Sequence, residues 1–102
     1  MLVKLVEVYT SGTYSDNGNI KPKYCLRETY INPDHVVCMR EENSLAPTVI
    51  NEDMDPRQGF TKLHINRGQA GLDITVVGSL NVIEEKLHKS LKSKKLLHGW
   101  YV

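Results

Sequence analysis

The sequence predicts an α+β domain in which a mostly antiparallel, five-stranded sheet carries one C-terminal helix packed on it. Five segments alternate apolar and polar residues with the period of a β-strand. A serine at position 79 precedes a segment whose charge order suits a helix. The 102 residues are enough for one hydrophobic core, so residues 1–102 are expected to form a single domain.

The first three strands are expected over residues 2–10, 24–31 and 35–40. The segment 11–23 between the first two is rich in turn residues. Only the short turn Asn32–Asp34 separates the second strand from the third, which predicts that these two form an antiparallel hairpin.

The remaining strands are expected over residues 60–66 and 72–77, the second of them central in the sheet because it is nearly all apolar. Before them, residues 41–59 are a long acidic stretch that allows a short helix, a lid or a mobile loop. After them, Ser79 is expected to cap a helix over 80–93, and the apolar tail 96–102 is expected to dock on the body or on a partner chain.

Side chains of the expected helix follow helical spacing. Glu85 and Lys89 stand four residues apart in the favourable order for an ion pair. The apolar stripe toward the sheet is formed by Val82 or Ile83 together with Leu87 and Leu91.

Charge is unevenly distributed although the net charge is only +1. Residues 41–56 hold five acidic side chains and no basic one, whereas residues 57–102 hold eight basic against three acidic. The C-terminal part can therefore attract an anion, or it is a solvated helix face beside an acidic loop. The near-neutral total gives no reason to expect a nucleic-acid polymer as partner.

Several classes of protein lack support in the sequence. The two cysteines and four histidines have no metal-ligand spacing, so no metal and no cofactor are expected. There is neither a nucleophile elbow nor a phosphate-binding loop, so no enzyme is expected. No apolar run approaches the length of a membrane span and the N-terminus alternates with charge, so we expect a cytoplasmic protein with no membrane partner.

The segment 60–73, FTKLHINRGQAGLD, holds the candidate ligand site. Arg67 stands in a glycine-containing turn that suits a phosphate. Phe60 offers a ring for a base to stack on, and Asn66 and Gln69 offer groups for base or ribose edges. The same residues also fit an ordinary hairpin with a solvated arginine.

Two stretches, YCLRETYINPDHVVCMR at 24–40 and FTKLHINRGQAGLDITVVGSLNVIEEKL at 60–87, resemble the phage anti-Thoeris sponge family of the first-described type. The resemblance implies a protein that is not an enzyme. Such a protein binds the glycocyclic ADP-ribose signal of a bacterial TIR-domain enzyme intact in the host cytoplasm, so that the effector stays inactive. It also implies sites at subunit interfaces, self-association as a dimer or hexamer, and in some members a second site for cyclic oligonucleotides.

The family's ligand contacts are a stacking Phe, an Asn and several Arg, which the resemblance places on Phe60, Asn66 and Arg67. The arginines expected in the C-terminal helix are absent, and Lys86 and Lys89 stand there as point charges. Arg27 and Arg40 are further candidates for neutralising a diphosphate.

Two other functions remain open. Short flagellar-operon proteins of the FlbD type share the compact strand pattern followed by a helix, which would make this chain a small adaptor. A third possibility is an RNA-binding β-dimer, which steep salt dependence of RNA binding would reveal.

Overall fold

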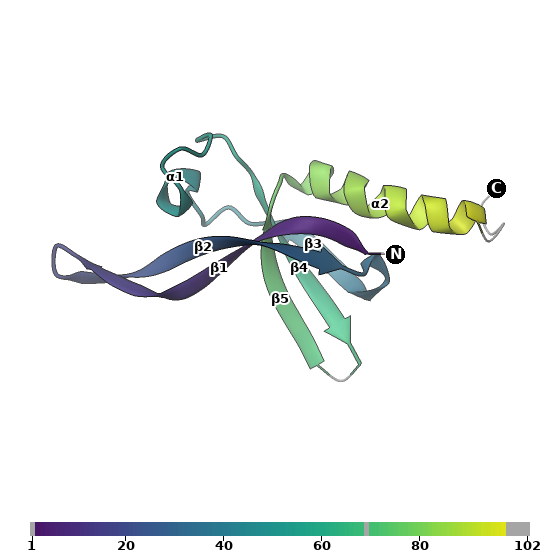
Figure 1. The fold of residues 1–102 in the computed structure, drawn as a ribbon, viewed down its shortest axis with the longest axis horizontal. Coiled ribbons are helices and arrows are strands. Elements are labelled where there is room, and N and C mark those ends of the chain that lie inside the picture. Colours follow the sequence, from purple (N-terminus) through teal and green to yellow (C-terminus); the bar gives the residue numbers. More distant parts are fainter. Residues whose placement is uncertain (1, 69, 98–102) are drawn as a thin grey trace.

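A computed structural model describes residues 2–68 and 70–97 and shows an α+β fold, as the sequence predicts (Figure 1). Its five strands form one sheet in the order β2-β1-β5-β4-β3, with every neighbouring pair antiparallel. The elements are β1 (Val3–Asp16), β2 (Asn19–Ile31), a 3-10 turn (Pro33–His35), β3 (Val36–Glu41), α1 (Pro47–Ile50), β4 (Phe60–Arg67), β5 (Ala70–Val77) and α2 (Leu80–Leu97).

The first two strands are longer than predicted because the turn between them is only two residues long. Asn17 and Gly18 have positive φ angles of 51° and 80°, and Asp16 pairs directly with Asn19. This geometry suits the right-handed twist of a two-stranded ribbon. The predicted turn region 11–23 is therefore mostly strand.

The predicted hairpin between residues 24–31 and 35–40 is wrong. β2 pairs with β1 while β3 pairs with β4, so they lie at opposite edges of the sheet. The long β1–β2 ladder already satisfies the backbone hydrogen-bonding groups along one edge of β2. The 3-10 turn does not fold the chain back onto the other edge of β2. Asn32 caps that turn by accepting a 3.0 Å hydrogen bond from the Asp34 N–H. Because this connection is short, the end of β2 lies near the start of β3, and the sheet curls around its core.

β1 and β5 are joined through only two residue pairs, Glu7 with Val76 and Val8 with Thr75. Beyond them β1 leaves β5, and the β1–β2 ribbon projects as an arm, which we define as residues 10–24 (Figure 1). The radius of gyration is 16.0 Å, against about 13 Å for a compact domain of this length. The arm and α2 extend in opposite directions along the longest axis, which gives the molecule its elongated shape (Figure 1).

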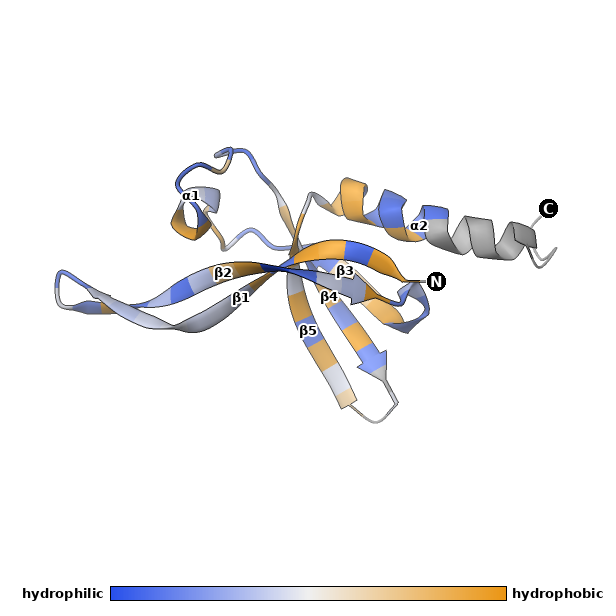
Figure 2. Ribbon diagram, viewed as in Figure 1, coloured by the Kyte–Doolittle hydropathy of each residue, from blue (hydrophilic) through white to orange (hydrophobic). Residues whose placement is uncertain are grey.

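The core lies between one face of the curled sheet and the first half of α2. Apolar and polar residues alternate along β4 and β5, which Figure 2 shows as bands of contrasting colour. The predicted central place of β5 is confirmed, although only its second half is buried. The buried cluster consists of Leu5, Ile31, Leu63, Ile65, Ile74, Val76, Ile83 and Leu87.

The helix α2 begins directly after Ser79, whose carbonyl accepts a 3.0 Å hydrogen bond from the Ile83 N–H. It extends to Leu97, four residues beyond the predicted end. Of the predicted stripe, Ile83 and Leu87 are core residues, whereas Val82 is 45% exposed. The predicted ion pair between Glu85 and Lys89 is present at 3.2 Å.

Some predictions fall on residues that the structure does not describe, namely the Leu91 side chain and the tail segment 98–102. The long acidic stretch contains the short helix α1. Within residues 2–68 and 70–97, no helix is long and apolar enough to cross a membrane.

We expect Gly78→Ala to destabilise the fold more than Gly12→Ala. Both glycines have φ near +135°, so each change carries a backbone cost of about 1–3 kcal/mol. At Gly78 the added Cβ would also lie 2.8 Å from Ile83 Cδ1, whereas at Gly12 it meets nothing within 4 Å. Urea denaturation of both variants measures the difference, and equal losses would show that the contact with Ile83 is harmless.

Candidate functional site

Polar side chains form two rows across β3, β4 and β5, on the face opposite α2. The register aligns Cys38, His64 and Asp73 in one row, and it places Arg40 beside Lys62 in the next. These five residues surround a cavity of about 340 Å³, which we call the polar hollow.

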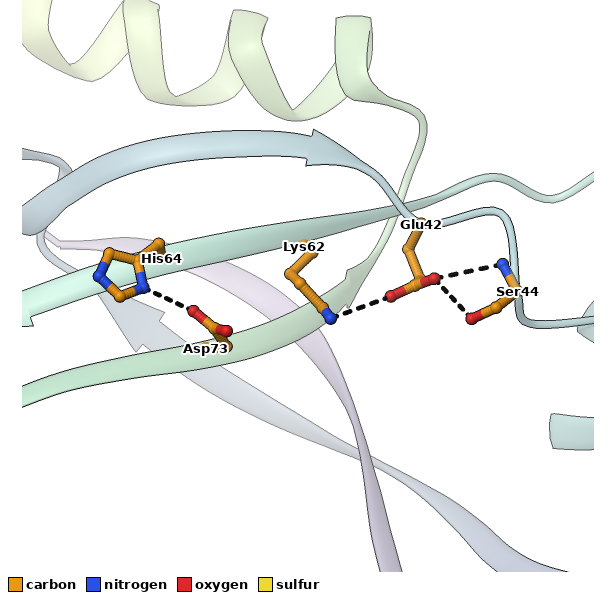
Figure 3. A network of polar contacts seen from close by, with 5 residues as sticks. All are labelled: Glu42, Ser44, Lys62, His64 and Asp73. Atoms are coloured by element: carbon orange, nitrogen blue, oxygen red, sulfur yellow. Dashed lines mark hydrogen bonds and ion pairs between the residues drawn. The ribbon is translucent and has the colours of Figure 1, made fainter.

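In the first row the His64 imidazole is held by Asp73. Nδ1 lies 2.6 Å from the Asp73 carboxylate, and Figure 3 shows the two side chains facing each other from neighbouring strands. A Cβ on Gly71 would lie 3.0 Å from His64 Cε1, so a larger residue there would require the ring to shift by a few tenths of an ångström. The hydrogen bond from His64 holds the pKa of Asp73 below its ordinary value, and the charges of Lys62 and Arg40 act in the same direction.

In the second row Lys62 is in contact with the loop that follows β3. Its Nζ lies 3.4 Å from a Glu42 carboxylate oxygen. The other Glu42 oxygen accepts hydrogen bonds from the Ser44 hydroxyl at 2.6 Å and from its N–H at 3.2 Å. Figure 3 shows this chain of contacts beside the His64–Asp73 pair. The Ser44 hydrogen bonds, with Lys62, lower the pKa of Glu42.

A second cavity of about 510 Å³ adjoins the polar hollow where the arm leaves the sheet, and we call it the crook. Lys62 and Asp73 line both cavities. At the base of the arm, β1 contributes Tyr9 and β2 contributes Tyr24 and Arg27 to the lining of the crook.

Arg27 is fixed in place by a bidentate ion pair. Its Nε and one terminal nitrogen each lie 3.1 Å from an oxygen of Glu7, a residue only 8% exposed. Its guanidinium carbon lies 4.3 Å from the centre of the Tyr9 ring. The hydrogen bonds to Glu7 raise the pKa of Arg27, whose charge is balanced by that carboxylate.

The structure does not bring the predicted ligand residues together. Arg40 lines the polar hollow and Arg27 lines the crook. Lys86 and Lys89 lie on α2, which packs on the opposite face of the sheet. Asn66 is exposed near the far end of β4.

Three predicted roles require correction or fall outside the described residues. Phe60 is only 3% exposed, so its ring is part of the protein interior and is not an accessible stacking surface. Phe60 is the first residue of β4, where it is paired with Val77. The Arg67 side chain and the whole of Gln69 lie outside the described residues.

Several residues that line the two cavities were not among the predicted ligand contacts, although the sequence pattern pointed to some of them. Alternation along residues 60–66 places Lys62 and His64 on one strand face. The sequence did not reveal the register of β4 against β5, and this register is what brings Asp73 next to His64.

Comparison with known proteins finds no matching family model, no similar curated protein and no similar solved structure. The chemistry of the site therefore rests on its side chains. Arg40 and Lys62 supply cationic donors, Asp73 and Glu42 supply carboxylate acceptors, and each of the four lines the polar hollow or the crook.

The depressed pKa of Asp73 predicts a pH effect on stability. Such a group stabilises the fold above its unfolded pKa of about 4 and loses this contribution as pH falls through its lower folded pKa. We expect Asp73→Asn to lower stability at neutral pH and to make its decline below about pH 4 shallower. Urea denaturation from pH 7 to pH 2 measures this, with Glu52→Gln as a charge-matched control. An unchanged slope for Asp73→Asn would contradict the assigned interaction.

Proposed function

We propose that this protein is a sponge that binds a phosphate-bearing cyclic nucleotide signal of the glycocyclic ADP-ribose type and holds it without cleaving it. The observation that supports this most is the polar hollow, where Arg40 and Lys62 lie side by side and Lys62 also lines the larger crook. Arg40 has no ion pair or hydrogen bond from its side chain within the described residues, so its guanidinium is available to a phosphate.

The mixture of charges in these cavities favours a sugar phosphate over a simple anion. Cationic side chains neutralise phosphate oxygens, whereas carboxylates such as Asp73 accept hydrogen bonds from ribose hydroxyls. The adjoining cavities have volumes of about 340 Å³ and 510 Å³. Each volume is within the range of small-molecule sites, about 300–1,000 Å³.

Sequestration acts by mass action, so the protein has to bind the signal more tightly than the effector does and has to be present in excess of it. The proposed place of action is the cytoplasm of the host cell, where the signal is made.

Self-association as a dimer or hexamer is part of this proposal. A two-stranded ribbon without a covering layer is marginally stable in water, yet the arm here carries a well-formed turn and exposed side chains such as Tyr14 and Ile20. A second copy that covers the arm would stabilise it.

The test is exposure of the purified protein to lysate of cells with an active TIR-domain enzyme, followed by heating and mass spectrometry of the released molecules. We expect an intact cyclic nucleotide that activates its effector again. Release of ADP-ribose or of another hydrolysed product would show an enzyme, and release of no nucleotide would reject the proposal.

One observation favours a second candidate, a small adaptor of the FlbD type. The arm and the apolar side chains Leu2, Tyr30 and Leu72 are all exposed, as in proteins that contact other proteins. Tryptic mapping of copurifying proteins distinguishes the two functions, because an adaptor retains a specific partner and a sponge retains a nucleotide.

A further inference from the structure

A third cavity, of about 460 Å³, opens on the face of the sheet that carries the buried cluster, and we call it the apolar trough. Three residues of that cluster line it, namely Ile31, Ile65 and Ile74. Leu72 also lines it, and its pairing with Ile65 places both side chains on this same face. No described residue of α2 lines the trough. The trough is therefore a part of the core face that the described part of the helix leaves open.

The rim of the trough combines apolar side chains with a few polar ones. Leu2 and Leu72 are each more than half exposed. Thr29, Asn32 and His35 add polar groups to the same cavity. An exposed apolar patch with polar groups around it is typical of a surface that another chain covers.

The chain itself contains a segment whose chemistry matches the trough. Residues 98–102, which follow α2, read His-Gly-Trp-Tyr-Val and include the one tryptophan of the sequence. Tryptophan and tyrosine bury large rings, and their N–H and O–H groups need hydrogen-bond partners when they are buried. An apolar floor with a polar rim satisfies both needs. The same two residue types dominate the binding energy of many protein interfaces.

The direction of α2 points to the tail of another molecule as the occupant. The helix begins beside the start of β4, where the Gly78 N–H donates a 2.9 Å hydrogen bond to the Gly59 carbonyl. Figure 1 shows its other end extending past the N-terminus of β1 and beyond the sheet. The residues after Leu97 therefore start outside the body of their own molecule, where a neighbouring copy can receive them.

We propose that the apolar trough is the docking site for segment 98–102 of a second copy of this chain, with Trp100 as the anchor. The inference rests on the self-association that is part of the proposed function, and it supplies the interface. Each copy offers one tail and one trough, so two copies can form a closed symmetric pair. The trough and the polar hollow lie on opposite faces of the sheet, so docking leaves the polar hollow open.

Tryptophan fluorescence of the full chain tests the docking, because Trp100 alone contributes to it. We expect the emission of a buried indole at high protein concentration and a red shift on dilution. Leu72→Lys puts a charge into the trough and should give exposed emission at every concentration. The matched control is Val37→Lys on β3, which is 61% exposed and outside the trough, and it should behave as the unchanged chain does.

Mixing two variants shows which copy the tail enters. Leu72→Lys keeps the tail but loses the trough, whereas Trp100→Gln keeps the trough but loses the anchor. An excess of Trp100→Gln should therefore restore buried emission to Leu72→Lys. If Leu72→Lys fails to fold by circular dichroism, Leu2→Lys, at another exposed position of the rim, takes its place.

Three results would overturn the proposal. Buried emission that persists in the folded trough variant would place the tail elsewhere. Emission that is lost in this variant and is not restored by mixing would place the tail in its own copy. Exposed emission of the full chain at high concentration would leave the trough to a different partner. None of these readouts involves a nucleotide, so the docking can fail while the nucleotide site stands, and the reverse.

Discussion

Replacing Arg40 and Lys62 together by glutamine is expected to weaken nucleotide binding by at least about a hundredfold. Each side chain loses a charge-assisted hydrogen bond to phosphate, worth about 1.5–3 kcal/mol, so the pair loses 3 kcal/mol or more. Glutamine keeps much of the length and polarity of both side chains. Both positions lie on the solvent-facing side of the sheet, so the fold should tolerate the change.

The matched control is the double change Lys86→Gln and Lys89→Gln. It removes the same amount of charge from α2, on the other face of the sheet. We expect titration calorimetry to show at most a severalfold loss for this control, through long-range attraction alone. An equal loss in both double variants would show that general charge and not the polar hollow holds the ligand.

Leu63→Ala is expected to cause the largest loss of stability, about 3 kcal/mol and within the usual range of about 2–5 kcal/mol for such a change. Leu63 has no exposed surface and lies in the middle of the cluster that joins the sheet to α2. A small domain has few other core residues to compensate for the cavity. Urea denaturation monitored by circular dichroism measures the effect.

Val37→Ala on the edge strand β3 serves as the control, because Val37 is 61% exposed. It should cost less than about 1 kcal/mol, as surface changes usually do. A loss for Leu63→Ala no greater than for Val37→Ala would contradict the position of the core.

The sequence predicted the fold class because strands and helices can be recognised from local patterns of residues. Alternation along residues 60–66 and 72–77 predicted two strands, and Ser79 marked the start of the helix. The actual pairing partners of β2 and β3, which are β1 and β4, could not be predicted in this way. Which strand pairs with which depends on competition between ladders, and the two-residue turn at Asn17–Gly18 gives β1 the advantage.

The candidate site was harder to predict than the fold. Arg27 and Arg40 were recognised as candidates, and both line a cavity. Phe60 was predicted to stack on the ligand because it is the one phenylalanine of the chain. A phenylalanine at the start of a strand is equally suited to the protein interior, where the structure places it. The contact of His64 with Asp73 depends on a β-sheet register that local patterns do not determine.

The most direct test of the central claim is an amide-resolved NMR titration of the protein with glycocyclic ADP-ribose. We predict that the largest shifts occur at Arg40, Lys62 and Asp73, with slow exchange indicating tight binding. Shifts confined to α2 or to the far end of β4, or a spectrum unchanged by excess ligand, would contradict the assignment of the polar hollow as the nucleotide site.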